Sequence, residues 1–131
     1  MTRRSLRLFL IGMVFGFSLG YMPHAQALEG PCRGMDVPAT IRCAADRWPV
    51  PGGKAKALDV AWCESRYNPK ATNGRFKGVY QIGDDEWRSW LSRFDTMRRE
   101  WVSHILHGRS NVLVAVRTVH RIHSWKPWSC A

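Results

Sequence analysis

The chain has 131 residues, of which 45% are hydrophobic and 23% are charged, and its formal net charge at pH 7 is +10. This length excludes more than one domain of ordinary size. The sequence has no internal repeat and no low-complexity tail, and it lacks a Ser-His-Asp elbow, a phosphate-binding loop and a dinucleotide fingerprint. Serine-hydrolase and nucleotide-dependent chemistry therefore have no support in the sequence.

The first 27 residues have the pattern of a secretory signal peptide. Residues 1–7 contain three arginines, residues 8–19 form an uncharged apolar run, and residues 25–27 read Ala-Gln-Ala, a small-x-small cleavage site. The apolar run is shorter than the roughly 20 residues that span a bilayer, which favours cleavage over a retained anchor. General export fits better than the twin-arginine route. We therefore expect a secreted protein whose mature chain, residues 28–131, is one domain.

The mature chain retains 17 basic residues against ten acidic ones, so its formal charge is +7. Such a charge outside the cell predicts an anionic partner, but it does not distinguish an acidic polymer from a membrane surface or a nucleic acid. An even number of cysteines without a Cys-x-x-Cys pair predicts two disulfides rather than a zinc site. Three pairings of the cysteines are possible. The cysteines are Cys32, Cys43, Cys63 and Cys130.

Two helices are predicted in the first half of the mature chain. Residues 37–47 carry apolar side chains at helical spacing and end before a Trp-Pro-Val-Pro sequence. Residues 54–63 repeat this pattern after a Gly-Gly turn, which places Glu64 in the last turn of the second helix. An Asn-Pro pair at residues 68–69 prevents the helix from continuing.

A small irregular hairpin is predicted for residues 70–82, because Asn73-Gly74 is a turn signal and residues 79–82 favour strands. Two more helices are expected at residues 84–94 and roughly 95–106. Apolar residues recur there at three- and four-residue steps, a pattern that favours core packing over a helix lying on a membrane. These residues are Trp87, Trp90, Leu91, Phe94, Met97 and Trp101.

Ser110 is expected to cap a last helix that continues through Ile122, although the β-branched residues of this segment also suit a strand. The histidines form two pairs spaced three apart, but no third ligand is evident once the cysteines are paired. We therefore expect solvated or capping histidines, with neither a metal nor a cofactor. These histidines are His104, His107, His120 and His123. The whole pattern predicts a mostly α domain of the α+β class, with about five short helices, one small irregular hairpin and two disulfides.

Glu64 is the strongest candidate for a catalytic residue. A carboxyl group at a helix C-terminus faces the negative end of the macrodipole, and the apolar neighbours Trp62 and Tyr67 are expected to desolvate it. Both effects favour the protonated form, which can donate a proton near neutral pH, as cleavage of a glycosidic bond requires. From position alone, however, a structural glutamate is the more common case.

A series of motifs in the same order resembles the lysozyme-like lytic transglycosylase domain. The motifs are Glu64-Ser65, Asn68-Pro69, Ala71, Gly78-Val79-Tyr80-Gln81-Ile82 and Trp87. Cys63 before the glutamate, and a terminal Trp, Pro and Cys130, resemble the bacterial resuscitation-promoting factors, a secreted branch of that fold. The resemblance covers about residues 54–131. It implies a disulfide between Cys63 and Cys130, which leaves Cys32 to pair with Cys43.

The resemblance also implies roles for individual residues. Glu64 matches the catalytic acid, Ser65 the serine that follows it, and Gln81 the glutamine that lines the sugar groove. Tyr80 stands where methionine or leucine is usual, and it either stacks on a sugar face or packs. Trp87 is expected to be structural. Glu86 replaces a threonine, and a helix-start role is favoured over a second catalytic carboxylate.

Two further departures from the family pattern concern the groove. The interval from Glu64 to Gln81 is one residue shorter than usual, and the later Tyr-Asn-rich motif of larger transglycosylases is absent, so a short groove is expected. Residues 65–83 contain no acidic residue, which favours a mechanism with a single carboxylate. The resemblance implies that this carboxylate first protonates the glycosidic oxygen and then accepts a proton from the 6-hydroxyl of the substrate, so that an anhydro ring forms.

The sequence therefore predicts a secreted or cell-wall-associated enzyme that cleaves the β-1,4 bond between N-acetylmuramic acid and N-acetylglucosamine in peptidoglycan. A lysozyme-type hydrolase is a possible variant of this function. The alternative is a non-catalytic cationic wall-binding or antimicrobial protein on the same fold. The expected partners are peptidoglycan glycan strands and anionic cell-wall polymers. We expect a monomer with no nucleic-acid partner and no stable membrane span after cleavage.

Overall fold

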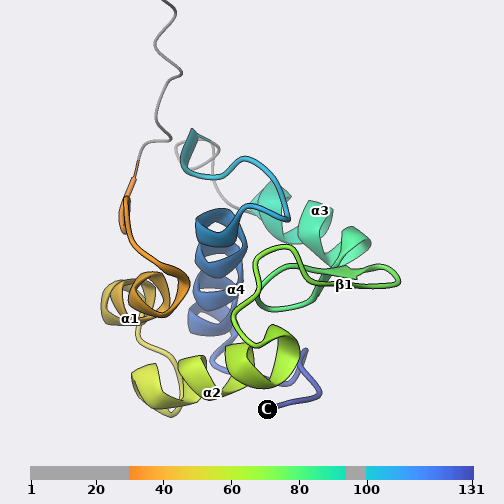
Figure 1. Cartoon of the computed structure of the whole chain (residues 1–131). Coiled ribbons are helices and arrows are strands. Elements are labelled where there is room, and N and C mark those ends of the chain that lie inside the picture. The colour runs from red at the N-terminus through yellow and green to blue at the C-terminus, as the bar shows by residue number, and fades with distance from the viewer. Residues whose placement is uncertain (1–29, 94–99) are drawn as a thin grey trace, which may run out of the picture.

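A computed structural model describes residues 30–93 and 100–131, so the predicted signal peptide lies outside the described residues. The described chain has an α+β fold with four α-helices and a three-stranded antiparallel sheet of order β1-β2-β3 (Figure 1). The helices are α1 Val37–Arg47, α2 Gly53–Ser65, α3 Asp84–Arg93 and α4 Gly108–Ile122. The strands are β1 Thr72–Asn73, β2 Phe76–Lys77 and β3 Ile82–Gly83. The two expected disulfides, Cys32–Cys43 and Cys63–Cys130, are both present.

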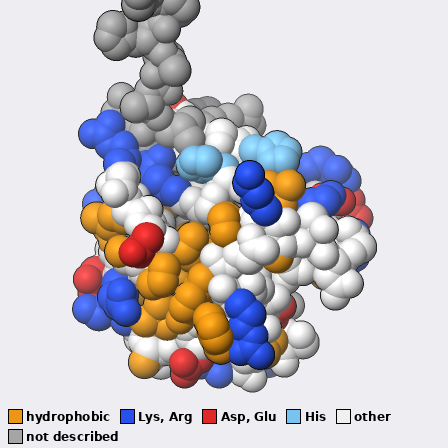
Figure 2. All heavy atoms as spheres, viewed as in Figure 1, with side chains coloured by type: hydrophobic (Ala, Val, Ile, Leu, Met, Phe, Trp, Pro, Cys, Tyr) orange, Lys and Arg blue, Asp and Glu red, His pale blue; other side chains and the backbone are white. Residues whose placement is uncertain are grey.

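Helix α4 forms the centre of the core. Its residues 110–116 are all buried, and α1 and α3 pack against it (Figure 1). A helix that is apolar around most of its circumference requires this complete burial. Ile41 of α1, Val60 of α2 and Tyr80 of the loop before β3 are fully buried in the same core. Hydrophobic side chains also reach the surface over α1 and α2, where both basic and acidic side chains border them (Figure 2).

The first two helices follow the predicted pattern. Helix α1 has the predicted bounds, and the Asp36 side chain caps it by accepting a hydrogen bond of 2.8 Å from the Ala39 N–H. Helix α2 begins one residue earlier and ends two residues later than predicted, so Glu64 does lie in its last turn. Helix α3 begins at Asp84 as predicted and is described through Arg93; the predicted last residue, Phe94, lies outside the described residues.

The helix predicted for residues 95–106 is wrong for residues 102–106, while residues 95–99 lie outside the described part of the chain. Residues 102–106 form loop and turn because side chains of α4 bind their backbone groups. Ser110 Oγ accepts a hydrogen bond of 2.9 Å from the Ser103 N–H, and Asn111 Nδ2 donates one of 2.8 Å to the Ile105 carbonyl. A helical path would require these groups to bond within the segment instead.

Ser110 is not the cap of α4. The helix begins at Gly108, and His107 is its N-cap residue, whose Nδ1 accepts a hydrogen bond of 3.3 Å from the Ser110 N–H. The expectation of a capping histidine is confirmed at His107. Ser110 itself lies in the first turn of the helix, where its hydroxyl is fully buried beside the His107 ring.

The predicted hairpin is present, but it is shorter and carries a third strand. Strands β1 and β2 pair antiparallel around Gly74, and β2 also pairs with β3. Residues 79–81, which the sequence assigns to a strand, form turns instead. Asn111 Oδ1 accepts the Tyr80 N–H at 2.8 Å, and the Val79 carbonyl accepts the Ser65 hydroxyl at 2.6 Å. Side chains from two helices therefore satisfy backbone groups that a neighbouring strand would otherwise bind.

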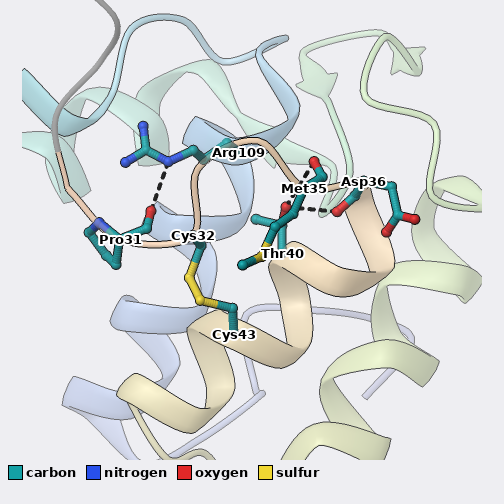
Figure 3. Close-up of a disulfide and its surroundings, with 7 residues drawn as sticks. All are labelled: Pro31, Cys32, Met35, Asp36, Thr40, Cys43 and Arg109. Carbon is teal, nitrogen blue, oxygen red and sulfur yellow. Dashed lines mark hydrogen bonds between the residues drawn. A yellow bond between two sulfur atoms is a disulfide. The ribbon is translucent and has the colours of Figure 1, made fainter.

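The Cys32–Cys43 disulfide attaches the lead-in segment to α1 (Figure 3). Arg109 of α4 holds the same segment, because its Nε donates a hydrogen bond of 2.9 Å to the Pro31 carbonyl (Figure 3). Arg109 Nη1 also donates one of 3.0 Å to the Trp101 carbonyl. A single arginine thus joins the start of the described chain, the segment after residue 99 and the central helix.

Candidate active site

The candidate site is a cavity of about 280 Å³ where three distant parts of the chain meet. The end of α2, the β-sheet with its following turn, and the C-terminal segment each contribute lining residues. These residues are Glu64, Asn73, Phe76, Gln81, Pro127, Trp128 and Ser129. A cavity of this size is close to the lower limit for pockets that bind small ligands, and its lining combines aromatic rings with a few polar groups.

Glu64 reaches the cavity from the last turn of α2. Its Oε1 atom is buried and has no hydrogen-bond partner among the residues that the structure describes. Burial raises the pKa of Glu64 above its ordinary value of 4.5, and a hydrogen bond from the Cys130 backbone partly opposes this effect. A carboxyl oxygen held away from water without a donor favours the protonated form of the group. Glu64 is therefore suited to hold a proton next to an open cavity.

The neighbours expected to desolvate Glu64 do not line the cavity. Trp62 is 47% exposed, its ring contacts the Tyr67 ring at 5.2 Å between centroids, and the Arg66 guanidinium lies over it at 4.8 Å. The aromatic part of the cavity wall comes from Phe76 of β2 and from Trp128 instead. Both rings are distant from Glu64 in the sequence, so the tertiary structure creates the aromatic part of this wall.

The C-terminal segment forms the wall next to Glu64 and is held at several points. The Cys63–Cys130 disulfide joins it to the residue that precedes Glu64, with Cα atoms 5.9 Å apart. Trp128 Nε1 donates a hydrogen bond of 2.7 Å to the Tyr80 carbonyl, and Trp125 Nε1 donates one of 2.9 Å to the Pro51 carbonyl. This wall is therefore positioned before any ligand arrives, which reduces the entropic cost of binding.

Gln81 lines the cavity. The family resemblance implies this position, because it matches Gln81 to a glutamine of the sugar groove. The Gln81 backbone has a φ of +47°, a conformation that non-glycine residues seldom adopt. Its side-chain Nε2 donates hydrogen bonds to the carbonyls of Ala71 at 3.1 Å and Gly78 at 3.0 Å. These bonds hold the amide in one orientation at the edge of the cavity. Unusual backbone conformations of this kind are frequent at functional sites.

Ser65 and Tyr80 are brought close to the site without lining the cavity. The Ser65 hydroxyl is buried, and its bond to the Val79 carbonyl ties the end of α2 to the turn that carries Gln81. Tyr80 is fully buried; its hydroxyl donates to the Ala57 carbonyl at 2.8 Å, and its ring stacks on Trp125. Of the two alternatives for Tyr80, packing is the one observed. Trp87 is likewise buried in the core, as expected.

Glu86 lies away from the cavity and pairs with Arg75, whose Nη1 and Nη2 donate hydrogen bonds of 2.8 and 3.2 Å to its carboxylate. These hydrogen bonds lower the pKa of Glu86, so its carboxylate stays charged. Asp84 is similarly paired with Lys77 Nζ at 2.7 Å. Glu64 is the only acidic residue that lines the cavity among the residues that the structure describes.

The sequence did not single out Asn73, Phe76 or residues 127–129 as parts of the site. The sequence does contain a signal for residues 127–129, because the implied Cys63–Cys130 disulfide brings the C-terminal segment beside Glu64. The sequence pattern predicts for Asn73 only a place in the turn with Gly74. No local pattern indicates Phe76, which is 39% exposed and reaches the cavity through the register of β1 and β2.

Two kinds of feature are absent from residues 30–93 and 100–131. No group of three or more histidine, cysteine, aspartate or glutamate side chains in these ranges is placed to hold a metal ion. No helix in the described part of the chain is long and apolar enough to cross a membrane. Compared with known proteins, the chain matches no protein-family model, no curated protein and no solved structure.

Proposed function

We propose that this protein is a secreted peptidoglycan-cleaving enzyme, and that Glu64 is its general acid and base. The substrate bond is the β-1,4 bond between N-acetylmuramic acid and N-acetylglucosamine. The observation that carries the proposal is the Glu64 carboxyl group, whose Oε1 is buried without a partner at the wall of the 280 Å³ cavity. A proton donor with a raised pKa is what cleavage of a sugar acetal requires.

A mechanism with one carboxylate agrees best with the lining of the cavity. Hydrolysis with inversion or retention uses a second carboxylate about 5 to 9.5 Å from the first. Glu86 and Asp84 do not line the cavity, and they form ion pairs with Arg75 and Lys77. In the proposed reaction, Glu64 gives its proton to the glycosidic oxygen as the bond from C1 breaks. The 6-hydroxyl of the same sugar attacks C1 and returns a proton to Glu64. An internal 1,6-anhydro ring forms, and Glu64 is again protonated.

The other lining residues suit a carbohydrate. Phe76 presents a partly exposed ring, which can stack on the apolar face of a sugar. The amide of Asn73 can bond to the N-acetyl groups of the substrate. Trp128 is buried and serves mainly to hold the wall in place. The cavity is small, so we expect contacts with the sugars on either side of the cleaved bond and few beyond them.

Mass spectrometry of the products from purified peptidoglycan tests this function. We expect muropeptides that end in 1,6-anhydro-N-acetylmuramic acid, because no second carboxylate lines the cavity among the described residues to activate water. Reducing ends instead of anhydro ends would show that the protein cleaves peptidoglycan by hydrolysis rather than by forming an anhydro ring. An absence of any product, with binding to the wall intact, would overturn the proposal and favour the non-catalytic cationic wall-binding protein.

The rate of cleavage should depend on pH through Glu64. The acid must be protonated when the substrate binds, so activity is full at low pH and falls as pH rises through the pKa of Glu64. Burial raises that pKa, which places the alkaline fall in activity above pH 4.5. Initial rates with peptidoglycan across a pH series, beside wall binding measured at each pH, separate this effect from loss of affinity. A fall in kcat/KM centred at or below 4.5 would contradict the assignment.

A further inference from the structure

A second surface of the molecule gathers positive charge where three helices end. Arg47 is the last residue of α1, Arg93 is the last described residue of α3, and α4 contributes cationic residues in its last two turns. We call this surface the arginine face. It comprises Arg47, Arg93, Arg117, His120, Arg121 and His123. None of these residues lines the cavity that contains Glu64.

The arginine face contains two hollows that share Arg117 and Arg121. The larger one has a volume of about 420 Å³ and is also bordered by Trp48, His120 and His123. The smaller one has a volume of about 20 Å³ and lies between α3 and α4, where Trp90, Arg93, Thr118 and Ile122 complete its lining. Arginines shared by two adjacent hollows can contact successive anionic groups of one extended molecule.

The positive charge exceeds what the helix ends themselves require. Cationic residues in a last helical turn are favourable because each C-terminus carries about half a negative charge. Three helix ends therefore account for about one and a half negative charges, whereas Arg47, Arg93 and Arg121 alone carry three positive charges. Among the described residues, no acidic side chain lines either hollow. The excess is a net positive potential on one face, which attracts anions from solution.

The arginines are held in ways that suit phosphate groups. The guanidinium groups of Arg47 and Arg117 each lie 5.6 Å from the centroid of the Trp48 ring, which restricts their motion. Arg121 Nη1 lies 3.4 Å from the Arg93 carbonyl, so it makes only a long hydrogen bond within the protein. A planar guanidinium group matches the oxygens of a phosphate bidentately, and the described lining of the hollows contains no lysine.

The side chains favour a dissolved polymer over a lipid bilayer. Trp48 is 9% exposed and cannot insert into a membrane. Ile122, at 44%, is the one large hydrophobic side chain of the hollows that is clearly exposed among the described residues. Stable binding to a membrane surface requires a broader apolar area. We propose that the arginine face binds a flexible polyanion with repeated phosphate groups, of the poly(glycerol phosphate) type. This binding does not depend on the proposed cleavage activity.

Binding to poly(glycerol phosphate) tests this proposal, measured by calorimetry over a series of salt concentrations. The double variant Arg93→Gln/Arg121→Gln should weaken binding by about tenfold or more and lower the slope of log Kd against log salt by about one to two. The matched control Arg42→Gln/Lys70→Gln removes the same charge from exposed positions outside both hollows. It should change Kd by less than about threefold. Thermal unfolding checks that both variants fold.

Three outcomes would overturn the proposal. Equal weakening by the control pair would mean that only net charge matters. Equal affinity for a carboxylate polymer such as polygalacturonate would remove the preference for phosphate. Binding to vesicles of phosphatidylglycerol without binding to the polymer would assign the face to membranes. The variant Arg93→Gln/Arg121→Gln should cleave short soluble glycan fragments at the wild-type rate. The proposed polyanion binding can therefore be disproved without disproving the proposed cleavage activity.

Discussion

Replacing Glu64 with Gln should lower the rate of peptidoglycan cleavage by about a thousandfold or more while leaving the fold intact. A general acid contributes about 10² to 10⁴ in rate, and here the same group also serves as the base. Glutamine has nearly the same shape and can accept the hydrogen bond from the Cys130 backbone. It cannot donate a proton to a glycosidic oxygen at any relevant pH. Release of anhydro-muropeptides measures the effect.

The matched control for this variant is Glu86→Gln. Glu86 is the residue that the sequence offers as a possible second catalytic carboxylate, but it pairs with Arg75 and does not line the cavity, so its loss should reduce activity by less than about threefold. Binding of both variants to intact peptidoglycan should equal that of the wild type. If Glu64→Gln kept its lytic activity, or if Glu86→Gln lost as much as Glu64→Gln, the assignment of Glu64 as the acid would be wrong.

Glu64→Gln should also change how stability depends on pH. Burial raises the pKa of Glu64 in the folded state, so the group contributes its full stability at low pH, and this contribution is lost as pH rises through the folded pKa. Glutamine does not ionise and does not suffer this loss. The variant should therefore match the wild type below pH 4 and exceed it at pH 7, as urea unfolding at both values would show. Such gains are common when a catalytic group is removed.

Replacing Asn111 with Ala should lower the free energy of unfolding by about 3 kcal/mol or more. Asn111 is fully buried and makes three hydrogen bonds across the fold. Its Oδ1 accepts from the Tyr80 N–H at 2.8 Å, and its Nδ2 donates to the carbonyls of Lys77 at 3.1 Å and Ile105 at 2.8 Å. Each buried group left without a partner costs about 1 to 3 kcal/mol. Urea unfolding measures the loss.

Two further substitutions define the cause of this loss. Asn111→Asp keeps the shape and the acceptor for Tyr80, but it places an acceptor where two carbonyls need a donor, so it should destabilise at neutral pH as much as Asn111→Ala. Thr118→Val is the control, because the Thr118 hydroxyl bonds only to the Val114 carbonyl of its own helix, at 2.7 Å. It should cost less than about 1 kcal/mol. If Asn111→Ala also lowered the free energy of unfolding by less than about 1 kcal/mol, contacts other than those of Asn111 would hold the turn at residues 78–81.

The same side chain explains why the turn at residues 78–81 has its shape. Gly78 has a φ of +81°, and a Cβ atom added to it would lie 2.2 Å from Asn111 Nδ2. The turn therefore packs directly on α4 and presents Gln81 to the cavity. Because Asn111 supports this turn, its loss should reduce cleavage as well as stability at temperatures where the variant remains folded.

Local patterns determined most of the helical structure. The apolar spacing of residues 37–47 and the Trp-Pro-Val-Pro sequence that follows are sufficient to define α1, because a helix needs only its own periodicity and an end signal. The same reasoning placed Glu64 in the last turn of α2 before Asn68-Pro69. The count of cysteines predicted two disulfides in the same local way.

Only the tertiary structure decided how the site is assembled. The turn at residues 79–81 replaced a predicted strand because Asn111, 31 positions away, binds the Tyr80 N–H. Glu64 lines a cavity that the C-terminal segment helps to close, and neither Trp62 nor Tyr67 lines it. Hydrogen bonds and burial between distant residues leave no period in the sequence. The chain thus specifies by itself where its candidate acid lies on a helix, whereas packing decides that one oxygen of this acid is buried at the wall of a cavity.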